Sequence, residues 1–212
     1  SKFEDARNKY SELLQLYGQK NLKRNLLYKG RMMRYFVRTD NLLEVLQLKD
    51  NFMQKKRTLD SAGWTEMSGY LLEKLYGDLD PSEEYLRTKI EDVKEMLMRA
   101  VKADEKNPVA LYNLSKYYVY MNNGELARSA LDRTINAFSE SERIKRRDMF
   151  KFIDSYRLLG EEYVEIREYF KALENYTDGI ALYQRERDEN GFEANHNIGV
   201  LYQDMGDVDY FI

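Results

Sequence analysis

The chain has 212 residues and a formal net charge of −3 at pH 7. It contains no cysteine, which excludes a disulfide framework and a thiolate metal site. No run of about 18 apolar residues occurs, so the sequence predicts no membrane-spanning helix.

Charge is distributed unevenly along the chain. Residues 1–60 carry 14 Lys and Arg against 7 Asp and Glu, whereas the remaining residues carry 20 against 30. Opposite charges at the two ends suit either head-to-tail self-association or a basic end that meets an acidic partner. A solvated surface of mixed charge is the plainer interpretation of the same counts.

The composition predicts an all-helical protein. Only two prolines and eleven glycines are present, too few for the many turns of a β-sandwich or barrel. Leu, Tyr, Glu, Lys and Arg are abundant, as is typical of helical chains. We therefore expect the all-α class, built from amphipathic helices.

Residues 1–60 are predicted to form basic amino-terminal helices. One helix is expected from about residue 2 to 17, ended by Gly18, and a basic one from about 21 to 38. Thr39 or Asp40 is the expected cap of a third helix, whose apolar residues begin at Leu42. This region is either a degenerate hairpin or a helical pair that covers the end of the structure.

From residue 61 on, the apolar pattern predicts successive helical hairpins. The first spans about 61–107, with a lengthened turn at 77–81, and the second spans about 108–141, with a turn at 122–124. The third spans about 142–188, and its first helix is long, from about residue 140 to past Tyr163. A truncated fourth hairpin, 191–212, is expected to turn at 205–207.

One spacing recurs at the start of these hairpins. Its bulky residues fall on one stripe of a helix, and its small residues let two antiparallel helices approach closely. A single hairpin of this kind cannot bury its apolar face, so hairpins must stack. The stretches are Tyr156-x-x-Leu159-Gly160-x-x-Tyr163 with Ala172-x-x-x-Tyr176, Trp64-x-x-Met67-Ser68-x-x-Leu71, Leu111-x-x-Leu114-Ser115-x-x-Tyr118, and Asn195-x-x-Ile198-Gly199-x-x-Tyr202.

This pattern resembles the fingerprint of the tetratricopeptide repeat (TPR), in which a bulky residue, Leu-Gly and Tyr precede Ala-x-x-x-bulky. The resemblance covers residues 61–212 and implies an α-solenoid, a right-handed superhelix of antiparallel helical hairpins. The starts at Leu111, Tyr156 and Asn195 are 45 and 39 residues apart, longer than the usual period of about 34.

The resemblance also implies a protein-binding groove lined by the first helix of each hairpin. Residues just outside the packing stripe would contact a partner helix or an extended segment. Tyr112 and Tyr120 are the expected anchors and Arg157 the orienting charge; alternatively, the two tyrosines only fill the inside of the superhelix. The candidate partner-binding residues are Tyr112, Lys116, Tyr120, Arg157, Glu161, Glu165, His196 and Gln203.

No catalytic constellation is recognisable, and we predict a non-enzymatic protein without cofactor or metal. His196 is the single histidine, which excludes a metal site built on paired histidines. Neighbouring acids such as Glu161 and Glu162 point about 100° apart on a helix and do not converge on one substrate. Short basic runs at 55–57 and 143–147 are interpreted as solvated faces, and the irregular hairpin spacing argues against a nucleic-acid-binding repeat.

These observations favour a protein–protein interaction scaffold within a larger bacterial assembly. In general character, the tyrosine-rich hairpins are also similar to the periplasmic flagellar motor collar proteins of spirochaetes. The alternative is a regulatory or substrate-recruiting domain of a larger enzyme, since we interpret the chain as a fragment of a longer protein. Both bacterial cytoplasm and periplasm fit, with a slight preference for the periplasm.

Overall fold

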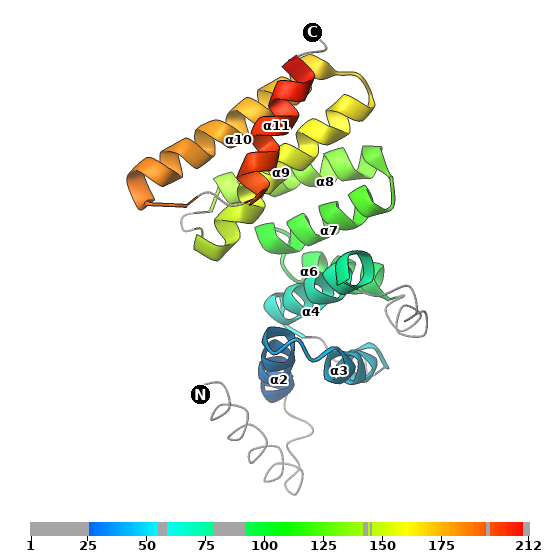
Figure 1. Cartoon of the computed structure of the whole chain (residues 1–212). Helices are drawn as coiled ribbons and strands as arrows, with labels where there is room; N and C mark the ends of the chain where they lie inside the picture. The colour runs from blue at the N-terminus through cyan, green and yellow to red at the C-terminus, as the bar shows by residue number, and fades with distance from the viewer. Residues whose placement is uncertain are drawn as a thin grey trace, which may run out of the picture.

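The computed structural model describes residues 26–54, 59–78, 92–141, 144, 146–193 and 196–209. Every regular element in this part of the chain is helical, comprising nine α-helices and one short π-helix, η2 (Figure 1). The all-α class predicted from the composition is confirmed. None of the described helices combines the length and the apolar content that crossing a bilayer requires.

The helices pack in a regular order along the chain. Most contact the next helix in sequence, and α4, α7, α9 and α11 also contact one another in succession (Figure 1). The described elements are α2 (Leu26–Arg38), α3 (Leu42–Gln54), α4 (Ser61–Glu73), η2 (Lys74–Asp78), α6 (Val93–Ala103), α7 (Pro108–Tyr120), α8 (Gly124–Ser139), α9 (Arg146–Glu165), α10 (Tyr169–Asn190) and α11 (His196–Asp209).

Short polar turns determine where the central helices begin and end. Asn107 caps α7, because its side-chain oxygen accepts two backbone N–H groups of the first turn at 3.1 and 3.2 Å, and Pro108 occupies the first helical position. Asn123 caps α8 in the same way, which confirms the turn predicted at 122–124. Gly191 ends α10 in the left-handed conformation, with φ +60°.

Two predicted boundaries near helix starts are wrong. The cap of α3 is Asn41, whose side-chain oxygen accepts the N–H of Glu44 at 3.4 Å, whereas Asp40 has φ +52° and precedes the cap. Helix α9 begins at Arg146 and not near residue 140, because α8 continues to Ser139. The predicted helix at 2–17, Gly18, the basic run 55–57 and residues 79–81 lie outside the described residues.

The turn predicted at 205–207 is also wrong, since these residues lie within α11. Gly206 and Asp207 are turn-forming residues, but the apolar stripe of α11 continues past them. Leu201 and Val208 are both buried on this stripe, seven residues apart. Burial of the stripe against α9 and α10 therefore outweighs the local turn preference.

The apolar core runs along the whole described stack. One cluster of buried residues extends from α2 to α7 and a second from α7 to α11, so α7 contributes to both. In the second cluster, Gly160 of α9 lies against the ring of Tyr176 of α10, which is 1% exposed. The missing side chain at Gly160 thus makes room for a buried aromatic ring.

Candidate protein-binding surface

Helices α7, α9 and α11 carry the residues that the sequence analysis assigned to partner binding, and α4 precedes them in the same series. Each of these helices packs against the next one in this series. We call the face that they form the first-helix surface. The predicted residues on it divide into buried groups that join neighbouring helices and exposed groups that face solvent.

Tyr112 belongs to the buried groups and joins α7 to α9. Its side chain is 6% exposed, and its hydroxyl donates a hydrogen bond to Oδ2 of Asp154 at 2.7 Å. Burial and the neighbouring Asp154 carboxylate hold the pKa of Tyr112 well above its ordinary value, so the hydroxyl keeps its proton. The ammonium groups of Lys116 and Lys151 each lie 5.8 Å from the centre of its ring.

Arg157 of α9 lies among three carboxylates, two from α9 itself and one, Asp204, from α11. Its guanidinium donates to Oδ1 of Asp154 at 2.8 Å and to the carboxylate of Glu161, and Oδ2 of Asp204 lies 3.9 Å away. The Arg157 side chain is only 17% exposed. We call Tyr112, Asp154, Arg157, Glu161 and Asp204 the Arg157 cluster.

The Arg157 cluster holds three carboxylates against one cation. Burial raises the pKa of Glu161 and of Asp204 above their ordinary values, although Arg157 acts in the opposite direction on both. Burial also disfavours charge on Arg157, but the carboxylates of Asp154 and Glu161 outweigh it and raise the pKa of Arg157. The positive charge of Arg157 therefore favours the ionised forms of Glu161 and Asp204.

Tyr120 belongs to the exposed groups. Its ring stacks on that of Tyr76, with 4.6 Å between the ring centres and 24° between the planes. Lys116 lies 5.4 Å from the centre of the Tyr120 ring, and the hydroxyl of Tyr76 is 3.7 Å from the sulfur of Met121. Tyr76 and Tyr120 remain 37% and 38% exposed, so they offer apolar contact area with polar edges.

A hollow of about 330 Å³ lies on this side of the molecule, lined by residues of α2, α4, α7 and α9. Gly69 of α4 leaves space beside Asn113 of α7, whose amide donates to the backbone oxygen of Thr65 at 3.1 Å. Glu73 and Lys151 bring opposite charges to its lining. Most of its other lining residues are also polar or charged, among them Glu66, Tyr70 and Arg147, so the hollow can receive a polar or an amphipathic side chain.

Glu165, His196 and Gln203 are exposed at other positions of the surface. Within the described residues, no hydrogen bond or ion pair joins them to the Arg157 cluster. Sequence reasoning missed Tyr76 of η2 and Asp204 of α11, because only the stacking of Tyr76 on Tyr120 and the packing of α11 against α9 bring them to this surface. Lys151 was missed for the same reason, although its position one turn before Asp154 would have been a usable signal.

Replacing Tyr112 by phenylalanine tests the link between α7 and α9. The ring is retained, but Asp154 loses a charge-assisted hydrogen bond, and we expect the free energy of unfolding to fall by about 1.5–3 kcal/mol. Urea denaturation measures the change. The matched control is Tyr118→Phe on the same helix, because the Tyr118 hydroxyl has no hydrogen-bond partner among the described residues; equal losses in the two variants would contradict the assignment.

The described residues contain no group of three or more His, Asp or Glu side chains arranged to hold a metal ion. No family model matches the chain, and no curated protein matches it significantly. What can be said about function therefore follows from the geometry of the first-helix surface.

Proposed function

We propose that the chain is a TPR-like α-solenoid that acts as a non-enzymatic scaffold and binds a helix or an extended segment of another protein on its first-helix surface. The observation that carries the proposal is the packing order. Each of the first helices α4, α7 and α9 contacts its own second helix and also the first helix of the following hairpin. Stacked helical hairpins of solenoid proteins have this order of contacts.

The exposed aromatic groups of the first-helix surface support its use in binding. Tyrosine is enriched at protein interfaces, because its ring adds apolar contact area at little entropic cost and its hydroxyl tolerates water. Tyr76 and Tyr120 are stacked and half-exposed, and Lys116 adds a positive charge beside them. These groups can reach a partner without breaking contacts inside the chain.

The buried groups have a different role in this proposal. Tyr112 and Arg157 already direct their polar atoms to Asp154. We infer that they hold α7, α9 and α11 in a fixed relation and so keep the contact surface in shape. In this proposal, Tyr120 and Lys116 contact the partner directly. Tyr112 and Arg157 do not contact it but fix the positions of the helices that carry the contact residues.

A double variant of the exposed groups tests the proposal. With Lys116→Glu and Tyr120→Ala combined, we expect affinity for the partner to fall by about 2 kcal/mol or more, roughly 30-fold, while a cooperative unfolding curve shows that the chain is still folded. The partner is first recovered by pull-down from native lysate that includes the membrane fraction. Its affinity for each variant is then measured by calorimetry with the purified proteins.

The matched control is the double variant Met98→Ala with Lys102→Glu on α6. Met98 and Lys102 are exposed and lie four residues apart, as Lys116 and Tyr120 do, but on a second helix. The control should bind the partner like the wild type. Equal affinity of both double variants would show that the first-helix surface is not the binding site.

A further inference from the structure

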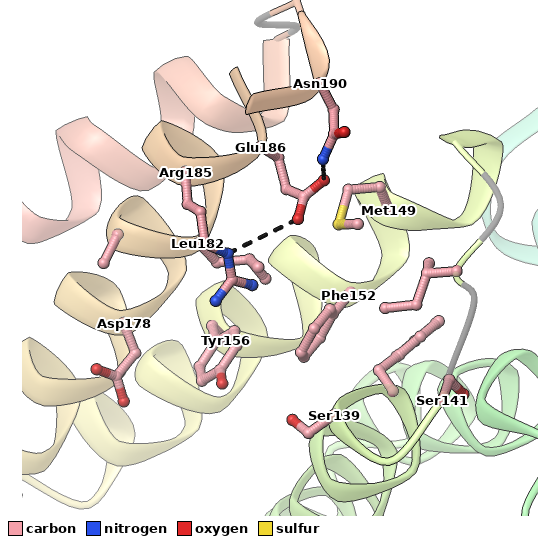
Figure 2. Close-up of a pocket in the computed structure, with 13 residues that line it drawn as sticks. Ser139, Ser141, Met149, Phe152, Tyr156, Asp178, Leu182, Arg185, Glu186 and Asn190 are labelled. Atoms are coloured by element: carbon pink, nitrogen blue, oxygen red, sulfur yellow. Dashed lines mark hydrogen bonds and ion pairs between the residues drawn. The ribbon is translucent and has the colours of Figure 1, made fainter. Parts of the chain in front are cut away.

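A second and larger hollow lies between α8 and α10, away from the 330 Å³ hollow of the first-helix surface. It measures about 930 Å³ and is open to solvent, with α9 as its floor (Figure 2). Its residues come from the end of α8, the following connection, α9 and α10, and none of them lines the other hollow. We call it the α8–α10 groove.

The groove forms because α9 and α10 are longer than α7 and α8. Helices α9 and α10 have 20 and 22 residues, whereas α7 and α8 have 13 and 16. Six or seven additional residues correspond to about 10 Å of helix. The amino-terminal part of α9 and the carboxyl-terminal part of α10 thus extend beyond the end of α8 (Figure 1), and the hollow lies beside this extension.

The floor of the groove is aromatic and the α10 wall is amphipathic. Phe152 of α9 stacks on Phe138 of α8, with ring centres 5.1 Å apart, and lies 5.6 Å from the ring of Tyr156. On α10, Asp178, Leu182 and Arg185 follow one another at four- and three-residue steps, so they share one face of the helix (Figure 2). The floor of the groove is therefore apolar but largely covered, since Phe152 and Leu182 are 5% and 7% exposed, and charged side chains border it along α10.

Charged side chains of the groove have partners near the carboxyl terminus of α10, whereas the opposite end of the groove carries an acidic residue without one among the described residues. Arg185 lies 3.8 Å from Glu186, and Arg146 donates to the backbone oxygen of Gly191 at 2.8 Å, next to the end of α10. At the other end, Asp178 has no hydrogen bond or ion pair among the described residues. Ser139, the last residue of α8, lies on the opposite wall, and a helix carboxyl terminus carries partial negative charge.

We propose that the α8–α10 groove binds an amphipathic α-helix of a partner protein. The apolar side chains of that helix contact Phe152, Tyr156 and Leu182. Its first turn is basic and lies between Asp178 and the end of α8. The charge argument fixes this orientation, because the amino terminus of a helix is also its positive end. The wall from Asp178 to Asn190 is about 18 Å long, which accommodates about three turns of helix. This binding site is separate from the first-helix surface, and its test does not depend on whether the first-helix surface binds a partner.

A display library of helical peptides tests the proposal. Peptides of about 16 residues, randomised on one face, are selected against the wild-type chain. We expect the enriched peptides to carry an apolar stripe and Lys or Arg in the first turn. A fluorescent copy of the best peptide should bind Ala181→Arg, which fills the groove from an exposed position, at least tenfold more weakly than the wild type.

Charge is tested by reversing one residue. Asp178→Lys should weaken the peptide about fivefold at low salt and less at high salt, as expected for one exposed ion pair. Asp188→Lys is the matched control, because Asp188 is exposed on α10 but does not line the groove. Ser129→Arg is the matched control for Ala181→Arg, because Ser129 is exposed on α8 but does not line the groove. Both control variants should bind the peptide as tightly as the wild type.

Three outcomes would overturn the proposal. The first is a library that yields no binder. The second is a set of binders that Ala181→Arg does not weaken, because the groove is then not their site. The third is a wild-type chain that is dimeric by sedimentation and becomes monomeric on Ala181→Arg, because a second copy of the chain then occupies the groove.

Discussion

Replacing Gly160 by alanine is expected to lower the free energy of unfolding by about 3 kcal/mol, at the upper end for overpacking of a core. A methyl group on Gly160 would lie 2.6 and 2.7 Å from Cδ1 and Cζ of Tyr176 and closer still to Cε1. The ring is almost fully buried, so it cannot move aside into solvent. Thermal or urea unfolding of the purified variant measures the loss.

Gly199 provides the matched control. It occupies the same position of the recurring spacing as Gly160 and lies inside α11, but among the described residues no atom outside its own stretch of helix would come within 4 Å of a methyl group there. Gly199→Ala should therefore be neutral or stabilise the chain by up to about 1 kcal/mol through helix propensity. Equal losses at the two glycines would contradict the steric explanation.

A second substitution identifies the ring as the cause. Combining Gly160→Ala with Tyr176→Leu removes the ring atoms that the methyl group would meet. The double variant should lose less stability than the two single variants together, with an interaction energy of about 1–3 kcal/mol. Strict additivity would mean that Gly160 acts on the backbone of α9 and not through Tyr176.

The contrast between Gly160 and Gly199 shows how far the spacing alone can predict. Both glycines stand at the same position of the recurring sequence pattern, three residues before a tyrosine, and both lie on helices as expected. Only at Gly160 does an aromatic ring of the following helix occupy the space that the glycine leaves. Spacing thus predicts the helical face, whereas the size of a packing effect depends on the neighbouring helix, which the local pattern does not contain.

The ion pairs of the candidate site were also only partly predictable from the local sequence pattern. The sequence placed Arg157 and Glu161 on one face of a helix, and the structure joins them. It did not predict that Asp204, from a helix more than 40 residues further on, completes the surroundings of the same guanidinium. A long-range counter-charge turns a residue expected to face a partner into one that joins two helices of the chain.

The α8–α10 groove was only partly foreseeable. The interval of 45 residues between Leu111 and Tyr156 predicts a longer hairpin. The hollow depends in addition on where the extra residues are placed. The extra residues of this interval lengthen α9 at its start, and those of the 39-residue interval from Tyr156 to Asn195 lengthen α10. Both helices thus extend past the end of α8, and no described helix covers them there.

Replacing Arg157 by methionine is expected to lower the free energy of unfolding by about 3 kcal/mol at pH 7. Methionine retains much of the side-chain volume, but Asp154, Glu161 and Asp204 are left together without their cation. Removing one partner of a largely buried ion pair commonly costs about 3–5 kcal/mol, and the partial exposure of Arg157 favours the lower value. Urea unfolding at several pH values measures the effect.

The loss should shrink as the pH falls from 7 towards 5. The pKa values of Glu161 and Asp204 are already raised by burial, and without Arg157 the pKa of each rises further. A carboxyl group with a raised pKa in the folded state destabilises the protein above that pKa, and the lost stability returns as the pH falls through it. Arg157→Lys keeps the positive charge and should show a smaller loss with little pH dependence. If Arg157→Met instead loses the same free energy at every pH, packing and not charge explains the role of Arg157, and the Arg157 cluster does not hold α9 and α11 together electrostatically.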